Sequence, residues 1–365
     1  MAELIIHTEE IKNNIKTLSQ FFKEHHIEWS LITKVFSGDI DFLKNILTKD
    51  TLEHIGSVGD SRLTSLKNLK KVNPDIRTIY IKPPAIMYAD EVVEYADISL
   101  NSSYKTIKAL DTAAQKQNII HKIIIMIELG ELREGVQRDD LIDFYEKTFS
   151  LSNIEVIGLG SNLGCMYGVE PNYDKLLQLS LYKELISAKF NKELKYVSGG
   201  SSITLPLITQ NIIPKNINHF RIGEAAFFGT SPLENKQFLN LSTNTFEFHA
   251  NIIELDEKGL VPDGIISDAN IGHTADYNEE DVSEQSYKAI LDFGMLDVDR
   301  HDIETNDKVI KFVGITSDMT VINIGTNKTP EGKTKYHVGD TICFKPSYMG
   351  VARLLNSKFI DKKFI

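Results

Sequence analysis

Residues 30–39 read Ser30-Leu31-Ile32-Thr33-Lys34-Val35-Phe36-Ser37-Gly38-Asp39, an apolar run that ends in one lysine and then breaks at a glycine. The apolar residues predict a short β-strand, and the glycine predicts a turn directly after it. An amine held where a strand ends has little freedom, which suits a covalent amine nucleophile. A lysine after a strand is more often simply a solvated strand end, so a catalytic role depends on support from the rest of the chain.

Up to about residue 230 the chain alternates between short apolar runs and stretches of helical spacing. A helix is expected over residues 8–23, with Thr8 as its N-cap and Glu9 and Glu10 in its first turn. The run 123–127 is continuously apolar, as in a parallel strand that is buried on both faces. Strands are expected near residues 30–34, 52–58, 76–81, 97–100, 121–128, 154–159, 194–197 and 219–222. Eight strands that alternate with helices predict an α/β fold, a (β/α)8 TIM-like barrel.

The pattern changes beyond Phe238, where strand-like segments are joined by polar turns such as residues 256–259. The expected strands cover residues 246–254, 287–293, 309–314, 320–324 and 341–344. We therefore assign residues 1–235 to the barrel and residues 236–365 to a mainly β domain.

The composition excludes several classes of partner. A net charge of -11 and a pI near 5.5 argue against nucleic acid and anionic membranes, which attract basic surfaces. Cys165 and Cys343 are too few for a disulfide scaffold and form no zinc-like cluster in the sequence. No targeting segment or membrane span is evident, and the histidines are scattered. We expect a cytoplasmic protein that binds a small molecule and holds no metal.

In a barrel of this kind the active site is built from the loops that follow the strands. Lys34 follows the first expected strand, and Arg133 follows the fifth, between Gly130 and Gly135. Arginine is well shaped to hold a carboxylate with two parallel hydrogen bonds. A surface ion pair with one of the neighbouring glutamates, Glu131 or Glu134, explains Arg133 as well.

Glycine-rich turns follow the last three expected strands, at residues 158–164, 198–202 and 221–224. Glycines, hydroxyls and a helix start make a phosphate cradle, because backbone N–H groups converge there on an anion. A plain Ser/Gly loop is the alternative. A lysine after strand one, a phosphate cradle after strands seven and eight, and a carboxylate-binding arginine together suggest pyridoxal phosphate bound as a Schiff base to Lys34.

Segments in these loops and in the β domain also carry a resemblance that covers nearly the whole chain. The sequence resembles the pyridoxal-phosphate-dependent alanine racemase superfamily (fold-type III) and, within it, the ornithine and lysine racemase branch. The matching segments are residues 33–36, 129–135, 160–163, 198–200, 221–225, 297–299 and 317–318. The resemblance implies a homodimer in which each active site lies between one barrel and the partner's β domain, with an amino acid as substrate.

The resemblance also implies roles for single residues. Lys34 would carry the cofactor, and Arg133 would face the substrate carboxylate. Arg221 would face the pyridine nitrogen, which stays unprotonated because arginine keeps its own proton; simple proton exchange is then favoured over other reactions. The remaining cofactor-binding positions are Asn162 at the ring, and Ser201, Ser202, Gly223, Glu224 and Tyr348 at the phosphate.

Racemisation needs a base on each face of Cα, and Lys34 serves one face. Alanine racemases place a tyrosine on the other, but the matching position here is Met295, whose thioether cannot accept a proton. Another side chain or water could serve instead, or the protein is no two-base racemase. Asp318 is our candidate; it could equally bind the distal ammonium of ornithine or lysine, or be a turn aspartate. Tyr277 is a weaker candidate.

From these observations we expect a racemase that interconverts the L- and D-forms of an amino acid, with ornithine, lysine or another basic one as first-choice substrate. Two alternatives remain open at this point. One is a lyase or aldolase on the same cofactor scaffold, and the other is a non-catalytic protein that binds pyridoxal phosphate or an amino acid.

Overall fold

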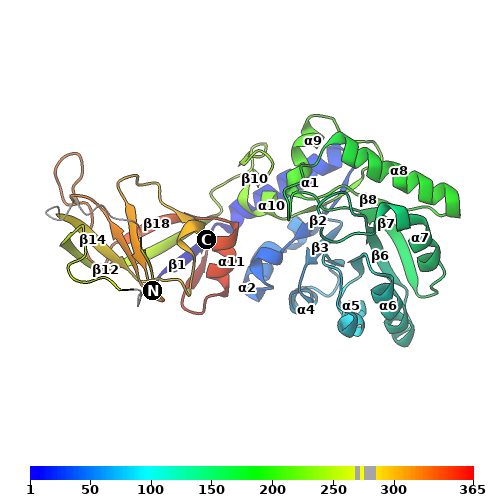
Figure 1. Cartoon of the computed structure of the whole chain (residues 1–365), viewed down its shortest axis with the longest axis horizontal. Coiled ribbons are helices and arrows are strands. Elements are labelled where there is room, and N and C mark those ends of the chain that lie inside the picture. Colours follow the sequence, from blue (N-terminus) through cyan, green and yellow to red (C-terminus); the bar gives the residue numbers. More distant parts are fainter. Residues whose placement is uncertain (268–271, 275–284) are drawn as a thin grey trace. The chain divides into compact units, whose positions relative to one another are not determined.

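The computed structural model describes residues 1–267, 272–274 and 285–365. The chain divides into two compact units, Glu9–Thr243 in one, and Met1–Thr8 together with Asn244–Ile365 in the other. The first unit is drawn in blue to green and the second mainly in yellow to red (Figure 1). The sequence analysis assigned residues 1–8 to the barrel, whereas their strand pairs with the C-terminal unit.

Glu9–Thr243 forms the predicted (β/α)8 barrel. Eight parallel strands close on themselves, and the last pairs with the first, Ser30 opposite Arg221. The strands are β2 (Glu28–Ile32), β3 (Ser57–Asp60), β4 (Thr78–Tyr80), β5 (Ile98–Asn101), β6 (His121–Met126), β7 (Ile154–Gly160), β8 (Tyr196–Ser198) and β9 (His219–Ile222). The helices are α1 (Thr8–Glu24), α2 (Ile40–Ile46), α3 (Lys49–Leu52), α4 (Leu63–Val72), α5 (Ala89–Tyr95), α6 (Tyr104–Gln117), α7 (Leu141–Phe149), α8 (Tyr173–Phe190), α9 (Leu205–Thr209) and α10 (Glu224–Phe228). A short hairpin follows, formed by β10 (Thr230–Ser231) and β11 (Lys236–Gln237).

An apolar cluster from several strands lies inside the barrel. The run 123–127 is at most 1% exposed, which confirms that this strand is buried on both faces. Helix α1 packs against the strands where the barrel closes, since Phe22 stacks on Trp29 of β2 at 5.5 Å and on Phe220 of β9 at 6.1 Å. Each such ring pair contributes about 0.5–1.5 kcal/mol beyond the area it buries. Strand β2, which precedes Lys34, and strand β9, which carries Arg221, therefore both pack against Phe22 of helix α1.

Three local expectations differ from the structure. The strand expected at 52–58 begins only at Ser57, because Thr48 caps α3 by accepting a hydrogen bond from Thr51 N at 3.3 Å. Strand β2 ends at Ile32, and Lys34 opens a short 3-10 helix, Lys34–Phe36, instead of ending the strand. Thr8 is the first residue of α1, and its hydroxyl donates to Ile365 O at 2.8 Å.

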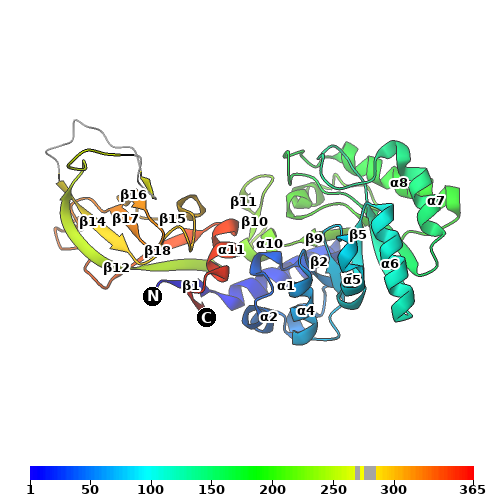
Figure 2. The same cartoon turned by 60° about the horizontal axis from the view of Figure 1, so that its bottom comes forward.

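The second unit is built mainly from strands, as predicted. They are β1 (Glu3–Ile6), β12 (Phe246–Gly259), β13 (His273–Thr274), β14 (Gln285–Leu291), β15 (Ile303–Glu304), β16 (Lys311–Ile315), β17 (Thr320–Asn323), β18 (Thr341–Pro346) and β19 (Asp361–Phe364). The long strand β12 pairs with β1 and β18 along its first half and with β14 along its second half (Figure 2).

The helix α11 (Tyr348–Asn356) in this unit was not predicted from the sequence. Ser347 caps it by accepting a hydrogen bond from Gly350 N at 3.1 Å. Among the described residues, no helix combines the length and the apolar character that a membrane crossing requires.

Candidate active site

Lys34 and Glu224 lie close together at the carboxyl-terminal edge of the barrel. Lys34 follows β2 and Glu224 follows β9, the strand paired with it. Burial raises the pKa of the Glu224 carboxyl, and the charge of Lys34 partly offsets this rise. The Lys34 side chain is exposed, but Thr33 before it is buried and donates its N–H to Gly59 O at 2.8 Å. A backbone fixed by hydrogen bonding therefore presents the Lys34 amine at this edge.

A hydrogen bond joins the turns after β8 and β9. Ser202 Oγ accepts a hydrogen bond from Ala225 N at 3.1 Å, which ties the first turn to the start of α10. Gly200 has φ +133°, and a Cβ there would collide with Thr204. A Cβ on Gly223 would lie 3.0 Å from Ile32 O. Two helix starts, whose first N–H groups lack an intrahelical acceptor, thus meet beside Lys34.

Arg221 is a buried cation, 4% exposed. It donates to Ser198 Oγ, to Ser161 O at 2.8 Å and to Asn162 Oδ1 at 2.6 Å, all neutral oxygen atoms. Burial lowers the pKa of Arg221 to about 10, against the opposing charge of Glu134, so the guanidinium stays charged at neutral pH. These bonds use three of its five N–H groups, and two remain for another acceptor.

A network of buried polar side chains is hydrogen-bonded to Arg221 through Ser198. Ser198 Oγ contacts His219 Nδ1 at 2.8 Å, and His219 Nε2 contacts Ser30 Oγ at 2.9 Å. Ser30 Oγ in turn lies 2.7 Å from Ser57 Oγ. Burial, reinforced by the charge of Arg221, lowers the pKa of His219 to about 3, so its ring is neutral. Because each side chain of this network has a hydrogen-bond partner, the network holds Ser198 in one orientation. Ser198 in turn orients Arg221.

Asn162 links Arg221 to a surface ion pair. Its Nδ2 donates to Glu134 Oε1, and the same carboxylate accepts from Arg133 Nε, and from Nη2 at 2.8 Å. Burial would raise the pKa of Glu134, but the Arg133 guanidinium lowers it below its ordinary value. Arg133 was expected either to bind a carboxylate ligand or to form a surface ion pair with a neighbouring glutamate. The structure shows the ion pair, with Glu134 as the partner. Arg133, Asn162 and Arg221 are nevertheless brought together, as the carboxylate-binding reading also requires.

Sequence reasoning missed the residues that shape the loops around Arg133. Glu131 is 2% exposed, and its carboxylate accepts N–H bonds from the loop 164–169. The donors are Gly164, Cys165, Met166, Tyr167 and Val169. Glu128 accepts from Gly130 N, and from Arg133 N at 3.1 Å, which folds the turn that carries Arg133. The acidic residues beside Arg133 were a visible signal, but nothing in the sequence joins Glu131 to residues 164–169.

The expected residues of the β domain lie in the second unit. Met295 N donates to Thr316 O at 2.9 Å and Leu296 N to Ser317 O at 3.0 Å, so the segment that carries Met295 runs beside Asp318. Asp318 is exposed and accepts from Ser317 Oγ at 3.1 Å. Tyr348 opens α11. Tyr277 lies outside the described residues.

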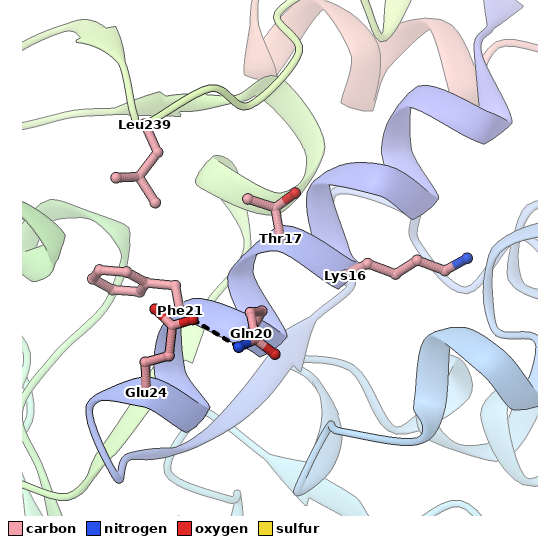
Figure 3. A pocket seen from close by; sticks show the side chains of 6 residues that line it. All are labelled: Lys16, Thr17, Gln20, Phe21, Glu24 and Leu239. Carbon is pink, nitrogen blue, oxygen red and sulfur yellow. Dashed lines mark hydrogen bonds between the residues drawn. The ribbon is translucent and has the colours of Figure 1, made fainter.

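A separate hollow of about 480 Å³ lies on the surface of α1 (Figure 3). Within it, Gln20 Nε2 donates to Glu24 Oε1 at 2.7 Å. Its lining contains none of the residues proposed for the active site: Lys16, Thr17, Gln20, Phe21, Glu24 and Leu239.

Residues 6–232 match the family model for the N-terminal domain of alanine racemase. The chain belongs to the alanine racemase family. It is 30% identical to ornithine racemase from Acetoanaerobium sticklandii, in an alignment that covers 100% of this chain and 99% of that protein. Lysine racemase from Thermotoga maritima is 28% identical, with 99% and 98% covered. The resemblance to the superfamily and to its ornithine and lysine branch is thereby confirmed.

The same family accounts for the fold. Alanine racemase from Clostridium difficile matches with a TM-score of 0.73 at 13% identity, over 100% of this chain and 95% of that one. The predicted combination of a (β/α)8 barrel and a mainly β region is therefore that of an alanine racemase family member.

Proposed function

We propose that the protein is a pyridoxal-phosphate-dependent racemase, an isomerase that interconverts the L- and D-forms of a basic amino acid such as ornithine or lysine. The observation that carries the proposal is the full-length likeness to two racemases named for those amino acids. The barrel supports it, because Lys34, Arg221 and the two glycine turns lie on neighbouring strand ends. A cytoplasmic location suits the two free cysteines.

The carboxyl-terminal edge of the barrel fits this cofactor. Gly200 and Gly223 keep the turns after β8 and β9 open to an anion, since a side chain at either position would crowd its neighbours. Arg221 has neutral partners and two N–H groups left over, which suits an uncharged ring nitrogen as acceptor. We assign the phosphate to Ser201, Ser202, Tyr348 and the backbone of Gly223 and Glu224, and the ring to Asn162 and Arg221.

Pyridoxal phosphate, when bound, supplies the electron-withdrawing ring that makes the Cα proton acidic. Lys34 holds the cofactor and moves a proton on one face of Cα. Arg221 keeps its proton at neutral pH, which its pKa of about 10 supports. Arg133 exchanges Glu134 for the carboxylate of the amino acid, which has the same charge and the same two-oxygen geometry.

A two-base reaction requires a second proton carrier, and Asp318 is our candidate, contributed by the β domain of a second copy in a homodimer. Its exposure leaves it open to such a contact. Replacing Asp318 by Asn should abolish racemisation, whereas exchange of the Cα proton for solvent deuterium should persist for the one enantiomer that faces Lys34. Ser317→Ala serves as the control. Racemisation at the wild-type rate in the Asn variant would exclude Asp318.

The cofactor assignment is tested by absorption spectroscopy. The cofactor-loaded protein should absorb in the visible range, and Lys34→Ala should shift or remove that band and stop racemisation. Lys44→Ala, an exposed lysine on α2, is the matched control. An unchanged band in Lys34→Ala would refute the assignment. Chiral chromatography of single enantiomers tests the substrate separately, and faster conversion of alanine or serine than of ornithine or lysine would overturn it.

A lyase or aldolase on the same cofactor is the second candidate, because the resemblance implies that Met295 takes the position of the tyrosine in alanine racemases. Such an enzyme would exchange the Cα proton with retention of configuration. Proton NMR in deuterated buffer, combined with chiral analysis, distinguishes retention from racemisation.

A further inference from the structure

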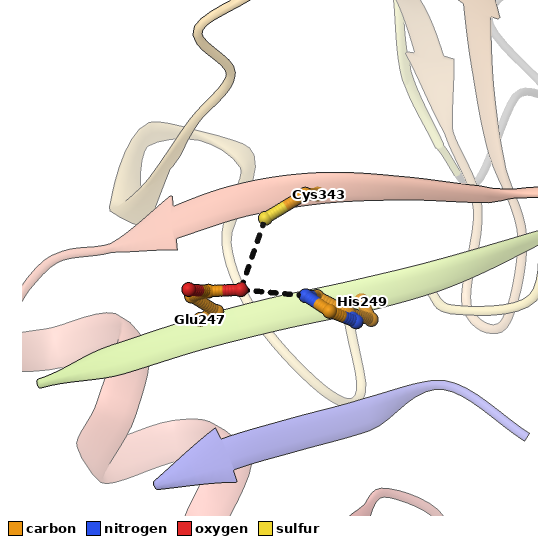
Figure 4. Close-up of side chains that lie close together, drawn as sticks. All are labelled: Glu247, His249 and Cys343. Carbon is orange, nitrogen blue, oxygen red and sulfur yellow. Dashed lines mark hydrogen bonds and ion pairs between the residues drawn. The ribbon is translucent and has the colours of Figure 1, made fainter. Parts of the chain in front are cut away.

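Side chains that can bind a metal ion meet on the polar face of the C-terminal sheet. Glu247 and His249 lie two residues apart on β12, so their side chains project from the same face. Cys343 on β18 is the cross-strand partner of His249, and these three side chains converge in Figure 4. His7 follows β1, the strand on the other side of β12. We call these four residues the β-face cluster: His7, Glu247, His249 and Cys343.

The opposite face of the same strands forms the core of the unit. Leu4, Phe248 and Phe344 are at most 6% exposed, and they alternate along the strands with members of the cluster or their neighbours. Three members of the cluster are half-buried, with side-chain exposures of 25% for His7, 30% for His249 and 38% for Glu247, and Cys343 is exposed. The cluster is therefore fixed by the sheet and still reachable from solvent.

The ligand atoms of Glu247, His249 and Cys343 lie close enough together to surround one small cation. Glu247 Oε1 lies 3.1 Å from His7 Nε2, and Glu247 Oε2 lies 2.8 Å from His249 Nε2 and 3.6 Å from Cys343 Sγ. The ligand atoms of Glu247, His249 and Cys343 all lie within 4.8 Å of one another. Ligands of a tetrahedral zinc ion are separated by about 3.3 to 3.8 Å, given bonds of about 2.0 to 2.3 Å.

We propose that the β-face cluster binds one zinc-type divalent cation. Imidazole, thiolate and carboxylate are the ligands that zinc prefers, and His249, Cys343 and Glu247 supply one of each. His7, 3.1 Å from Glu247, is the candidate for the fourth position of the tetrahedron. On binding, the Cys343 thiol releases its proton to solvent, and each imidazole ligates through Nε2 with its hydrogen on Nδ1. The thiolate and the Glu247 carboxylate then balance the charge of the ion. Such a site is structural and joins β1, β12 and β18.

The competing interpretation is a metal-free cluster, in which the Glu247 carboxylate simply accepts hydrogen bonds from its three neighbours. Both interpretations predict the same contacts in the absence of metal, so they differ only in what happens when a cation is added. Neither depends on the proposed racemase activity.

Cobalt titration distinguishes the two. The full-length, cofactor-loaded protein is stripped with a chelator and titrated with Co²⁺, and difference spectra are recorded against the same protein without metal. We expect one Co²⁺ per chain and a thiolate-to-cobalt charge-transfer band, which Zn²⁺ then removes by displacement. No band at saturating Co²⁺ would overturn the proposal.

Variants identify the ligands. Cys343→Ser should lose the band, and His249→Ala should weaken Co²⁺ binding by at least about 100-fold, since loss of an outer-shell partner alone costs about 10- to 100-fold. Cys165→Ser, the other cysteine, and His337→Ala, an exposed histidine of the same unit, should leave it unchanged. A band that survives Cys343→Ser would refute the site. As a check on folding, Zn²⁺ should raise the melting temperature of the wild type but not of Cys343→Ser.

Discussion

Arg221 Nη2 donates a hydrogen bond of 2.6 Å to Asn162 Oδ1, and Asn162 Nδ2 donates to Glu134, so one amide connects the buried arginine to the ion pair of Arg133. The Asn162 side chain thus accepts a hydrogen bond from Arg221 through Oδ1 and donates one to Glu134 through Nδ2. This arrangement places the two arginines in a fixed relation.

Replacing Asn162 by Ala should weaken cofactor binding by about tenfold, because Arg221 loses one of its three orienting partners and a charged hydrogen bond contributes about 1.5–3 kcal/mol. Fluorescence titration of the cofactor-free protein with pyridoxal phosphate measures the change. Asn153→Ala is the control, because Asn153 precedes the same strand, β7, at its opposite end and is also hydrogen-bonded. Equal affinities for both variants would contradict the prediction.

Replacing Arg133 by Ala should raise KM by about 10- to 100-fold with a smaller change in kcat, because the variant cannot make the charged hydrogen bond that we propose between Arg133 and the substrate carboxylate. Glu134→Gln should instead lower KM, since it removes the carboxylate that occupies Arg133 while an amide oxygen remains for Asn162. Steady-state kinetics measure both values. Arg138→Ala, an exposed arginine shortly after it, should behave as wild type. An unchanged KM in Arg133→Ala would restrict Arg133 to its surface ion pair.

Replacing Glu131 by Gln should free the loop 164–169. Burial would raise the pKa of Glu131, but the N–H bonds from Met166, Val169 and other loop residues outweigh it and lower the pKa. The carboxylate therefore contributes stability above the ordinary pKa of a glutamate, and that contribution is lost as the pH falls through the lowered value. Hydrogen exchange of the loop amides at pH 7 should accelerate about 10- to 100-fold. Glu170→Gln, an exposed neighbour, should leave exchange rates unchanged.

Replacing Asp60 by Asn should stabilise the barrel at neutral pH. Burial raises the pKa of Asp60 from 3.8 to about 6, against hydrogen bonds that include Arg62 N at 2.9 Å. The folded chain thus binds the proton more tightly than the unfolded chain, and stability falls as the pH rises from about 4 through 6. Above pH 6 this costs roughly 3 kcal/mol, which the amide avoids while keeping its oxygen as acceptor.

Melting temperatures test the Asp60 prediction. The gain of Asp60→Asn over the wild type should be larger at pH 8 than at pH 5. The control Asp75→Asn, at an exposed aspartate, should show no such pH dependence. A gain in melting temperature that grew toward low pH would contradict a raised pKa for Asp60.

The barrel could be predicted because each strand leaves a local trace. The apolar run 123–127 needs no distant partner to be recognised, and the neighbouring positions of Lys34 after β2 and Arg221 on β9 follow from the topology. Side-chain partners are different, since they depend on contacts between distant segments. Glu131 reaches residues more than 30 positions away, and His7 contacts Glu247 across 240 residues. Neither contact has a signature in the sequence around either residue.

Strand β1 lies at the start of the chain, yet it pairs with β12 and with β19, which ends at Phe364. During synthesis its two pairing partners emerge from the ribosome only after the whole barrel has been made. The barrel contains all of its own strands and can fold while translation continues, as domains generally do. The β unit has to wait for residues 361–364, so it is completed after the barrel.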